Sequence, residues 1–316
     1  MTNNCLVTKL KAVVNNDELK KIGEFRVEIK AVTSPDATNR GFTIRYLDTG
    51  EDHVLTLKGT NAYFTDSTLT QNLGTSLTVH PNVDTDVFVS NVDAVISIPD
   101  KYNIYKFDAY GSSWDRPNII FDVDELAASP IRYFLWQGAL GVYGNVDGLF
   151  NNGYIIQINL QNNLKVSGNI ENWGNTITAV RVTSPLINGN IGQSPIFSSI
   201  LENLLFTGCN VEGNIGTLSV LPALVSWTVN NTQITGDMGL AQFYRNTVLH
   251  GTVTLGNGVT GSIETFAQNL YAAGNRQSAI NLTATDNMTY NGQLAKTNYG
   301  STAHINLSGD APVITW

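Results

Sequence analysis

The sequence predicts a mainly β protein of two domains, because apolar residues recur with one spacing in the first part of the chain and with a different spacing in the second. From Glu24 to about Asp108, within an expected domain of residues 1–112, apolar residues follow a period of two, which is typical of strands with one buried face. From about residue 120, within an expected domain of residues 113–316, a strand and a glycine motif repeat every 22 to 27 residues, which is typical of a solenoid. We therefore expect a β-sandwich or barrel-like module, followed by a leucine-rich-repeat-like solenoid of about eight coils with short helices.

The first domain is predicted from short alternating runs, each bounded by Gly, Pro, Asn or Asp. The runs are Phe25–Ile29, Phe42–Tyr46, Val54–Leu57, Val87–Val89, Val95–Ile98 and Ile104–Phe107. A short helix is expected around Asp17–Lys21, with Asn15 or Asn16 as its cap. Trp114–Pro117 interrupts the alternation and marks the expected domain boundary.

The second domain is predicted from its repeat. Strands that end in an apolar residue recur at Trp136, Leu160, Val182, Phe206, Val229, Leu255, Leu282 and Leu307. Most are followed by Gly, a small polar residue and an aliphatic, at Gly144–Val146, Gly168–Ile170, Gly189–Ile191, Gly213–Ile215, Gly236–Met238, Gly261–Ile263 and Gly292–Leu294. Glycine permits the positive φ of a turn. One coil cannot bury its own apolar face, so stacking must provide the core.

Two short helical segments complete the prediction. Glu264–Ala273 should form the other side of one coil. The acids Asp122, Asp124 and Glu125 should introduce a similar segment that closes the open end of the first coil.

Composition limits the partners. The chain is 42% hydrophobic, and its net charge of −8 with no basic run longer than Lys20-Lys21 argues against a nucleic-acid partner. No window approaches the roughly 20 apolar residues of a membrane span, so no membrane partner is expected. Lys9 and Lys11 interrupt the apolar stretch near the N-terminus, which therefore lacks the pattern of a signal peptide.

No motif predicts catalysis, a metal or a cofactor. Gly256–Gly261 matches G-x-G-x-x-G, but Gly261 is the repeat glycine and no parallel βαβ unit surrounds it. The acids at 122–125 could hold Ca²⁺, although acids at a helix N-terminus are the commoner explanation. The four histidines lack zinc spacing, and Cys5 and Cys209 form no disulfide framework. Carboxylate pairs for sugar hydrolysis meet only in space, and the sequence selects none.

Polar residues alternate with the buried ones along the predicted strands and should form a ladder on one face. The positions are Gln157, Asn159, Gln161, Arg181, Thr183, Ser226, Thr228, Asn230, Thr252, Thr254, Asn281 and Thr283, and the ladder continues to Asn306 and Ser308. Such a face suits a glycan or a protein partner. A solvated face, or one packed against a symmetry mate, remains the open alternative.

Two parts of the sequence resemble known families. Repeat units such as Leu224–Met238 (LVSWTVNNTQITGDM) resemble the leucine-rich-like repeats with GDI or GNI motifs of gut Bacteroidales proteins and their phages. Leu6–Ile22 and Tyr63–Gly74 resemble the leader module of virion proteins from crAss-like phages. The resemblance implies a non-enzymatic head fibre or capsid-decorating protein, assembled into the virion in the host cytoplasm.

In that family, the N-terminal module would attach to capsid or tail proteins, and the solenoid would project or pack in a homo-oligomer. Trimers are common among fibres, although no heptad segment here fixes three-fold symmetry. A glycan or host-surface ligand is the expected partner of the repeat face. A tail-associated fibre and a bacterial cell-surface leucine-rich-repeat adhesin remain the alternatives. A tailspike-like enzyme would need carboxylates where the face has Asn, Gln, Thr and Ser.

Overall fold

The computed structural model describes residues 23–30, 41–58, 63–64, 74–89, 93–109, 119–138 and 141–316. The structure is mainly β, and its described strands form large mixed sheets, none of which is closed. The chain divides into two compact units: unit 1 comprises Met1–Phe134 and Gly138–Tyr143, and unit 2 comprises Leu135–Gln137 and Gly144–Trp316. The predicted helix at 17–21 and the predicted boundary at 112–117 lie outside the described residues.

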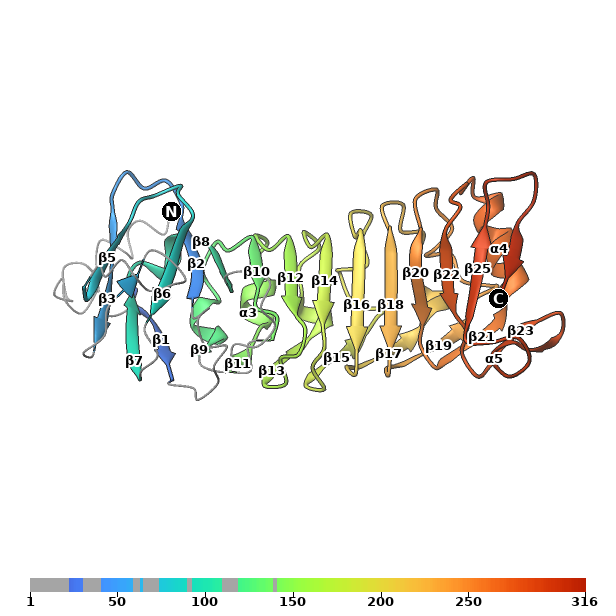
Figure 1. The fold of residues 1–316 in the computed structure, drawn as a ribbon, viewed down its shortest axis with the longest axis horizontal. Helices are drawn as coiled ribbons and strands as arrows, with labels where there is room; N and C mark the ends of the chain where they lie inside the picture. The colour runs from blue at the N-terminus through green and yellow to red at the C-terminus, as the bar shows by residue number, and fades with distance from the viewer. Residues whose placement is uncertain are drawn as a thin grey trace, which may run out of the picture. The chain divides into compact units, whose positions relative to one another are not determined.

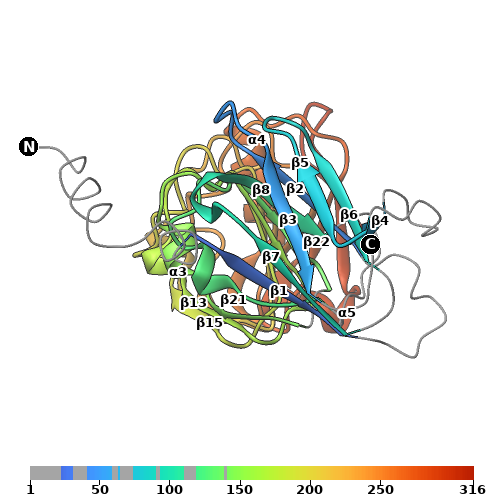
Figure 2. The ribbon, with the colours of Figure 1, turned by 90° about the vertical axis from the view of Figure 1, so that its left-hand side faces the viewer.

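Unit 1 contains two sets of paired strands. One has the order β5–β3–β7–β1–β9, and the other has the order β4–β6–β2–β8–β10. The bounds are β1 (Phe25–Ile29), β2 (Gly41–Tyr46), β3 (His53–Lys58), β4 (Tyr63–Phe64), β5 (Ser76–Val79), β6 (Thr85–Val89), β7 (Ala94–Ile98), η1 (Lys101–Asn103), β8 (Ile104–Ala109), β9 (Ile119–Asp122), η2 (Val123–Leu126) and β10 (Tyr133–Leu135). Figure 2 shows β5, β3, β7 and β1 side by side.

The strands of unit 1 form because alternate residues are apolar, as predicted. Strand β1 buries Phe25, Val27 and Ile29 and exposes the residues between them. The core is aromatic: Phe107 lies edge-on to Phe25 at 5.3 Å and to Phe42 at 5.1 Å between ring centroids. Strands β1 and β7 are antiparallel, as are β2 and β8, whereas β10 runs parallel to β8.

Unit 2 is built from two arrays of strands, shown in Figure 1, which are parallel except at their C-terminal ends. The first array, named the front sheet, contains β12 (Gln157–Leu160), β14 (Ala179–Val182), β16 (Asn203–Thr207), β18 (Ser226–Asn230), β20 (Gly251–Leu255), β22 (Ile280–Thr283), β25 (Thr302–Asn306) and β26 (Val313–Thr315). The second array, named the back sheet, contains β13 (Val166–Asn169), β15 (Ile187–Asn190), β17 (Asn210–Asn214), β19 (Gln233–Asp237), β21 (Gly258–Ser262), β23 (Met288–Tyr290) and β24 (Gln293–Leu294). At those ends, β24, β25 and β26 pair antiparallel. Strand β11 (Val142–Asn145) has residues in both units.

Short helices connect the strands of unit 2. They are α3 (Asp147–Phe150), η3 (Ile170–Asn172), η4 (Ile215–Thr217), α4 (Ile263–Ala272) and α5 (Ala295–Asn298). The predicted helix at 264–273 is confirmed as α4, which begins at a side-chain cap because Ser262 Oγ accepts a hydrogen bond from the Thr265 N–H.

The predicted strand-end residues pair in register from β12 to β20, and the register prediction is corrected beyond β20. Leu160 pairs with Val182, and Phe206 pairs with Val229, in parallel strands. At β22, Leu282 pairs with Val253 and not with the predicted Leu255. Strand β25, just before Leu307, runs antiparallel to β22, so the expected equivalence of Leu307 with the earlier strand ends is wrong.

The glycine motif has a second cause that the sequence does not reveal. Gly213 and Gly236 adopt φ of 119° and 122°, as the turn prediction requires. In addition, a Cβ on Gly213 would lie 2.7 Å from Oδ1 of Asn190, and a Cβ on Gly236 would lie 2.5 Å from Oδ1 of Asn214. Each Asn lies on the neighbouring strand of the back sheet that precedes the glycine in the chain. The motif therefore fixes both the turn and the close approach of neighbouring strands.

The Asn of the motif caps the segment that follows the strand. Oδ1 of Asn190 accepts a hydrogen bond from the Gly192 N–H at 2.9 Å, and Oδ1 of Asn214 accepts from the Gly216 N–H at 2.7 Å. Asp237 does the same with the Gly239 N–H at 2.7 Å. Asn and Asp are favoured here because a short side-chain acceptor satisfies an otherwise unpaired turn N–H.

Candidate binding face

The predicted polar ladder lies on the exposed face of the front sheet. Gln157 and Asn159 are on β12, Arg181 is on β14, Ser226, Thr228 and Asn230 are on β18, Thr252 and Thr254 are on β20, and Asn281 and Thr283 are on β22. Gln161 and Thr183 directly follow β12 and β14. The alternating residues are buried, as Ile158 and Leu160 show in β12. The structure therefore brings the predicted residues together on one side of one sheet.

Register places these side chains in rows across the sheet. One row runs through Asn159, Arg181, Leu205, Thr228, Thr254 and Thr283. A second row ends in Thr252, Asn281, His304 and Thr315. Sequence reasoning missed Leu205 and Asn203 in β16, His304 in β25 and Thr315 in β26. Leu205 makes the face less uniformly polar than predicted.

Many polar side chains of the face bond to the neighbouring strand. Ser226 Oγ donates to Asn203 Oδ1 at 2.9 Å, and Thr254 Oγ1 donates to Thr283 Oγ1 at 3.3 Å. Thr183 Oγ1 accepts from the backbone N–H of Asn162. Cross-strand pairs of this kind hold side chains in fixed positions before any ligand arrives, which lowers the entropy cost of binding.

The face is almost free of charge. None of the strands of the front sheet, all of which the structure describes, contains Asp or Glu. Arg181 is exposed, and its guanidinium makes no hydrogen bond or ion pair within the described part of the chain. The face can therefore offer amides, hydroxyls and a single guanidinium to a ligand, but no carboxylate pair for acid–base chemistry.

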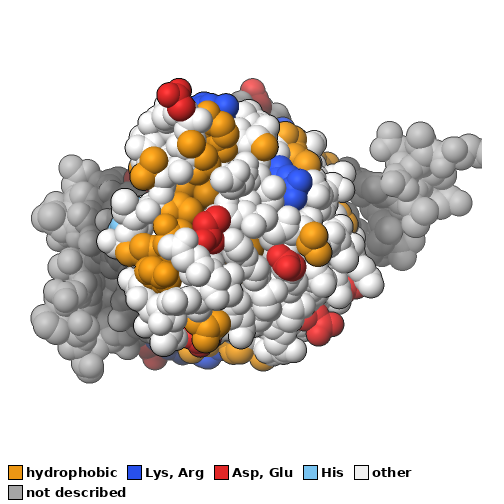
Figure 3. Space-filling model, turned by 90° about the vertical axis from the view of Figure 1, so that its right-hand side faces the viewer, with side chains coloured by type: hydrophobic (Ala, Val, Ile, Leu, Met, Phe, Trp, Pro, Cys, Tyr) orange, Lys and Arg blue, Asp and Glu red, His pale blue; other side chains and the backbone are white. Residues whose placement is uncertain are grey.

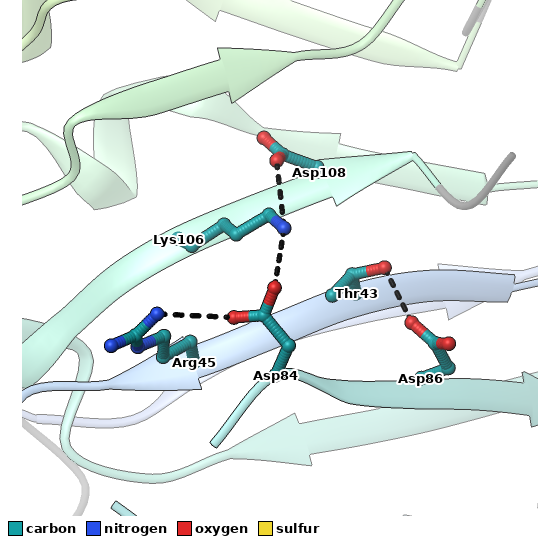
Figure 4. Close-up of polar contacts among 6 residues, drawn as sticks. All are labelled: Thr43, Arg45, Asp84, Asp86, Lys106 and Asp108. Atoms are coloured by element: carbon teal, nitrogen blue, oxygen red, sulfur yellow. Dashed lines mark hydrogen bonds and ion pairs between the residues drawn. The ribbon is translucent and has the colours of Figure 1, made fainter. Parts of the chain in front are cut away.

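Unit 1 has a charged cluster of a different kind, shown in Figure 4. Asp84 lies 2.7 Å from Lys106 Nζ and 3.6 Å from Arg45 Nη1, and Lys106 also lies 3.9 Å from Asp108. Cations and carboxylates alternate, so each charge is offset by a neighbour. The cluster connects β2 and β8 with the residue before β6, and we interpret it as a structural contact.

The other sequence candidates have structural explanations. Gly261 packs against the neighbouring strand β19, because an added Cβ would lie 2.6 Å from Asp237 Oδ1. Asp122 caps η2 by accepting from the Asp124 N–H at 3.0 Å, as expected for acids at a helix start. Cys209 is buried, as predicted, and burial raises the pKa of its thiol.

Within the described ranges, no group of three or more His, Cys, Asp or Glu side chains lies close enough to hold a metal ion. A helix that is both long enough and apolar enough to cross a membrane is likewise not found among the described residues.

Comparison with known proteins gives no relative: no family model, no curated protein and no solved structure matches this chain.

Proposed function

We propose that this chain is a structural protein of a phage virion, of the head-fibre or capsid-decorating type. Unit 1 attaches to the particle as a sandwich-like module, and unit 2 presents its front sheet as a leucine-rich-repeat-like solenoid. The observation that carries the proposal is the front sheet itself. Its strands are in parallel register over β12 to β22, and its exposed face is polar and free of carboxylates.

The carboxylate-free face supports binding over catalysis. Hydrolysis of a glycosidic bond generally uses two carboxyl groups about 5–9.5 Å apart. A solenoid enzyme of the tailspike kind would carry them on an exposed sheet, where this chain has Asn, Thr, Ser and Gln. The side chains that are present suit recognition, because amides and hydroxyls both donate and accept hydrogen bonds.

The end strands of unit 1 support attachment. Strands β5 and β4 are the outermost described strands of their sheets. An outermost strand has unpaired backbone N–H and C=O groups, which can pair with a strand of another protein. Capsid or tail proteins, and further copies of this chain in a homo-oligomer, are the proposed partners.

Mass spectrometry of gradient-purified phage particles tests the proposal. Many copies per particle, counted against the major capsid protein, would support a head fibre or decoration protein, and a few copies would indicate a tail-associated fibre. Recovery of the chain only from the bacterial envelope would overturn the virion proposal in favour of a surface adhesin.

Lysine cross-linking of intact particles tests the roles of the two units with the full chain. Attachment through unit 1 predicts links to the particle from exposed lysines such as Lys30 and Lys58, and not from Lys165 or Lys296 in unit 2. The opposite pattern would reverse the assigned roles.

A further inference from the structure

A groove lies at the end of the front sheet where the strands become antiparallel. It has a volume of about 380 Å³, and its lining includes Ser278, Asn281, His304, Asn306, Val313 and Thr315. Asn281 is paired with His304, and His304 is paired with Thr315. Directly paired residues of neighbouring strands share a face, so the groove belongs to the candidate binding face.

The contact between His304 and Asn281 determines what the groove offers. His304 Nδ1 lies 2.7 Å from Asn281 Oδ1. An amide oxygen only accepts, so Nδ1 must carry the hydrogen. In the neutral imidazole, Nε2 is then an acceptor without a hydrogen. The Asn281 amide nitrogen keeps its two donors. The hydrogen bond between Nδ1 and Oδ1 therefore holds a free acceptor, His304 Nε2, near a free donor, the Asn281 amide nitrogen.

The remaining lining adds donors and one apolar wall. Oδ1 of Asn306 accepts hydrogen bonds from the backbone N–H and from Oγ of Ser308, at 2.9 Å and 2.7 Å. The group of Asn306 that can bind a ligand is therefore its side-chain amide nitrogen. Ser278 and Thr315 add hydroxyls, and Val313 is 55% exposed. Figure 3, which faces this end of unit 2, shows that charged side chains there are few and separated, and that hydrophobic side chains gather in a stripe.

This pattern selects the chemistry of the ligand. The lining contains no Asp, Glu, Lys or Arg, so none of its side chains is permanently charged. A sugar hydroxyl can donate to an acceptor and accept from a donor, and adjacent hydroxyls can do both at once. The C–H face of a sugar ring is apolar and suits an exposed aliphatic side chain. Small-molecule sites commonly combine a few fixed polar groups with an apolar wall in this way.

We propose that the groove binds a neutral glycan. Adjacent sugar hydroxyls bond His304 Nε2 and the Asn281 amide nitrogen, and the ring lies against Val313. The inference rests on the proposed function, because it names the class of ligand that the presented face recognises.

The test uses the full chain on an array of neutral and uronic-acid-containing oligosaccharides, followed by calorimetry with the best-bound neutral sugar. The variants are Asn281→Ala and His304→Ala. Asn188→Ala is the matched control, because Asn188 is exposed and lies on β15 of the back sheet, outside both the candidate binding face and the groove. We expect binding of a neutral sugar that weakens about tenfold in each groove variant, as expected for loss of one or two hydrogen bonds, and stays unchanged in the control.

Three results would overturn the inference. They are no glycan binding, binding of acidic sugars alone, and neutral-sugar binding that survives both groove variants. Binding of acidic sugars alone would indicate a site at Arg181 instead. Arg181 lies on β14, about 19 Å from β22 at the usual strand spacing. None of these results bears on whether the chain is found in virions, so the proposed function can stand if the glycan site fails.

Discussion

Replacing Gly213 with alanine tests whether the motif glycine allows the close approach of neighbouring strands of the back sheet. An alanine there must adopt φ near 119°, and its Cβ would lie 2.7 Å from Asn190 Oδ1 and 2.8 Å from Ile191 Cγ1. The backbone strain costs about 1–3 kcal/mol. Displacing Asn190 also weakens its 2.9 Å bond from the Gly192 N–H, which costs about 1 kcal/mol more. We expect Gly213→Ala to destabilise unit 2 by about 3 kcal/mol.

Gly208→Ala provides the matched control. Gly208 has φ of 66°, and an added Cβ would meet nothing within 4 Å. Its substitution keeps the conformational cost, about 1–2 kcal/mol, without the clash. Urea unfolding followed by tryptophan fluorescence measures both variants in unit 2, because Trp136, Trp173 and Trp227 are buried there.

A double variant separates the clash from the strain. If Asn190 Oδ1 causes part of the penalty, Asn190→Ala with Gly213→Ala should cost less than the sum of the two single changes, because the truncated side chain makes room. Equal losses for Gly213→Ala and Gly208→Ala, together with an additive double variant, would refute the proposed contact between coils.

Three further predictions concern buried polar groups. Asn246→Leu should destabilise unit 2 by at least about 3 kcal/mol in thermal unfolding, and a loss under about 1 kcal/mol would contradict this. Asn246 is 5% exposed, and its side-chain amide forms hydrogen bonds with four backbone groups, at Leu221, Leu224, Val248 and Leu249. Burial raises the pKa of the Cys209 thiol, so peptide mapping after iodoacetamide treatment should find Cys209 unmodified in the folded chain and alkylated in urea; fast labelling of the folded chain would show that the thiol is accessible. Burial lowers the pKa of His53. The carboxylate of Asp100, 3.7 Å from Nδ1, acts in the opposite direction and raises that pKa, but burial has the larger effect. The unfolded chain therefore binds this proton at higher pH, and the stability of unit 1 should fall as pH drops below about 6.5 and level off below the folded value; urea unfolding across that range should show a weaker fall in His53→Gln, and an identical pH dependence would contradict the assignment.

Local patterns predicted much of the fold. Alternation in Phe25–Ile29 and in Gln157–Leu160 identified strands and their buried faces, because the pleat gives each strand an intrinsic period of two. The same alternation placed the polar ladder on one side of the front sheet. The motif glycines were predicted as turn residues. Their contact with the preceding Asn could not be predicted, since it depends on the spacing between coils.

The register at the end of the repeat was predicted less well. It depends on the path of the chain between two paired strands, and the number of residues between the strands does not determine that path. Strands β18 and β20 pair residues 26 apart, at Trp227 and Val253. Strands β20 and β22 pair residues 29 apart, at Val253 and Leu282, where the chain between them includes helix α4. Spacing alone therefore placed Leu282 two residues out of register. The contact between His304 and Asn281 depends on the antiparallel pairing of β25, which no repeat pattern indicates.

The two sheets of unit 2 place different demands on their residues. In the back sheet, motif residues such as Gly213 and Asn190 lie close together on neighbouring strands, so a change on one strand disturbs the next. In the front sheet, the buried residues of each strand provide the packing, while Thr228 or Asn281 contributes only to the exposed face. Under the function that we propose, stability and recognition are therefore carried by separate residues of unit 2. Substitutions on the front sheet would then change the ligand while the glycine contacts of the back sheet stay the same.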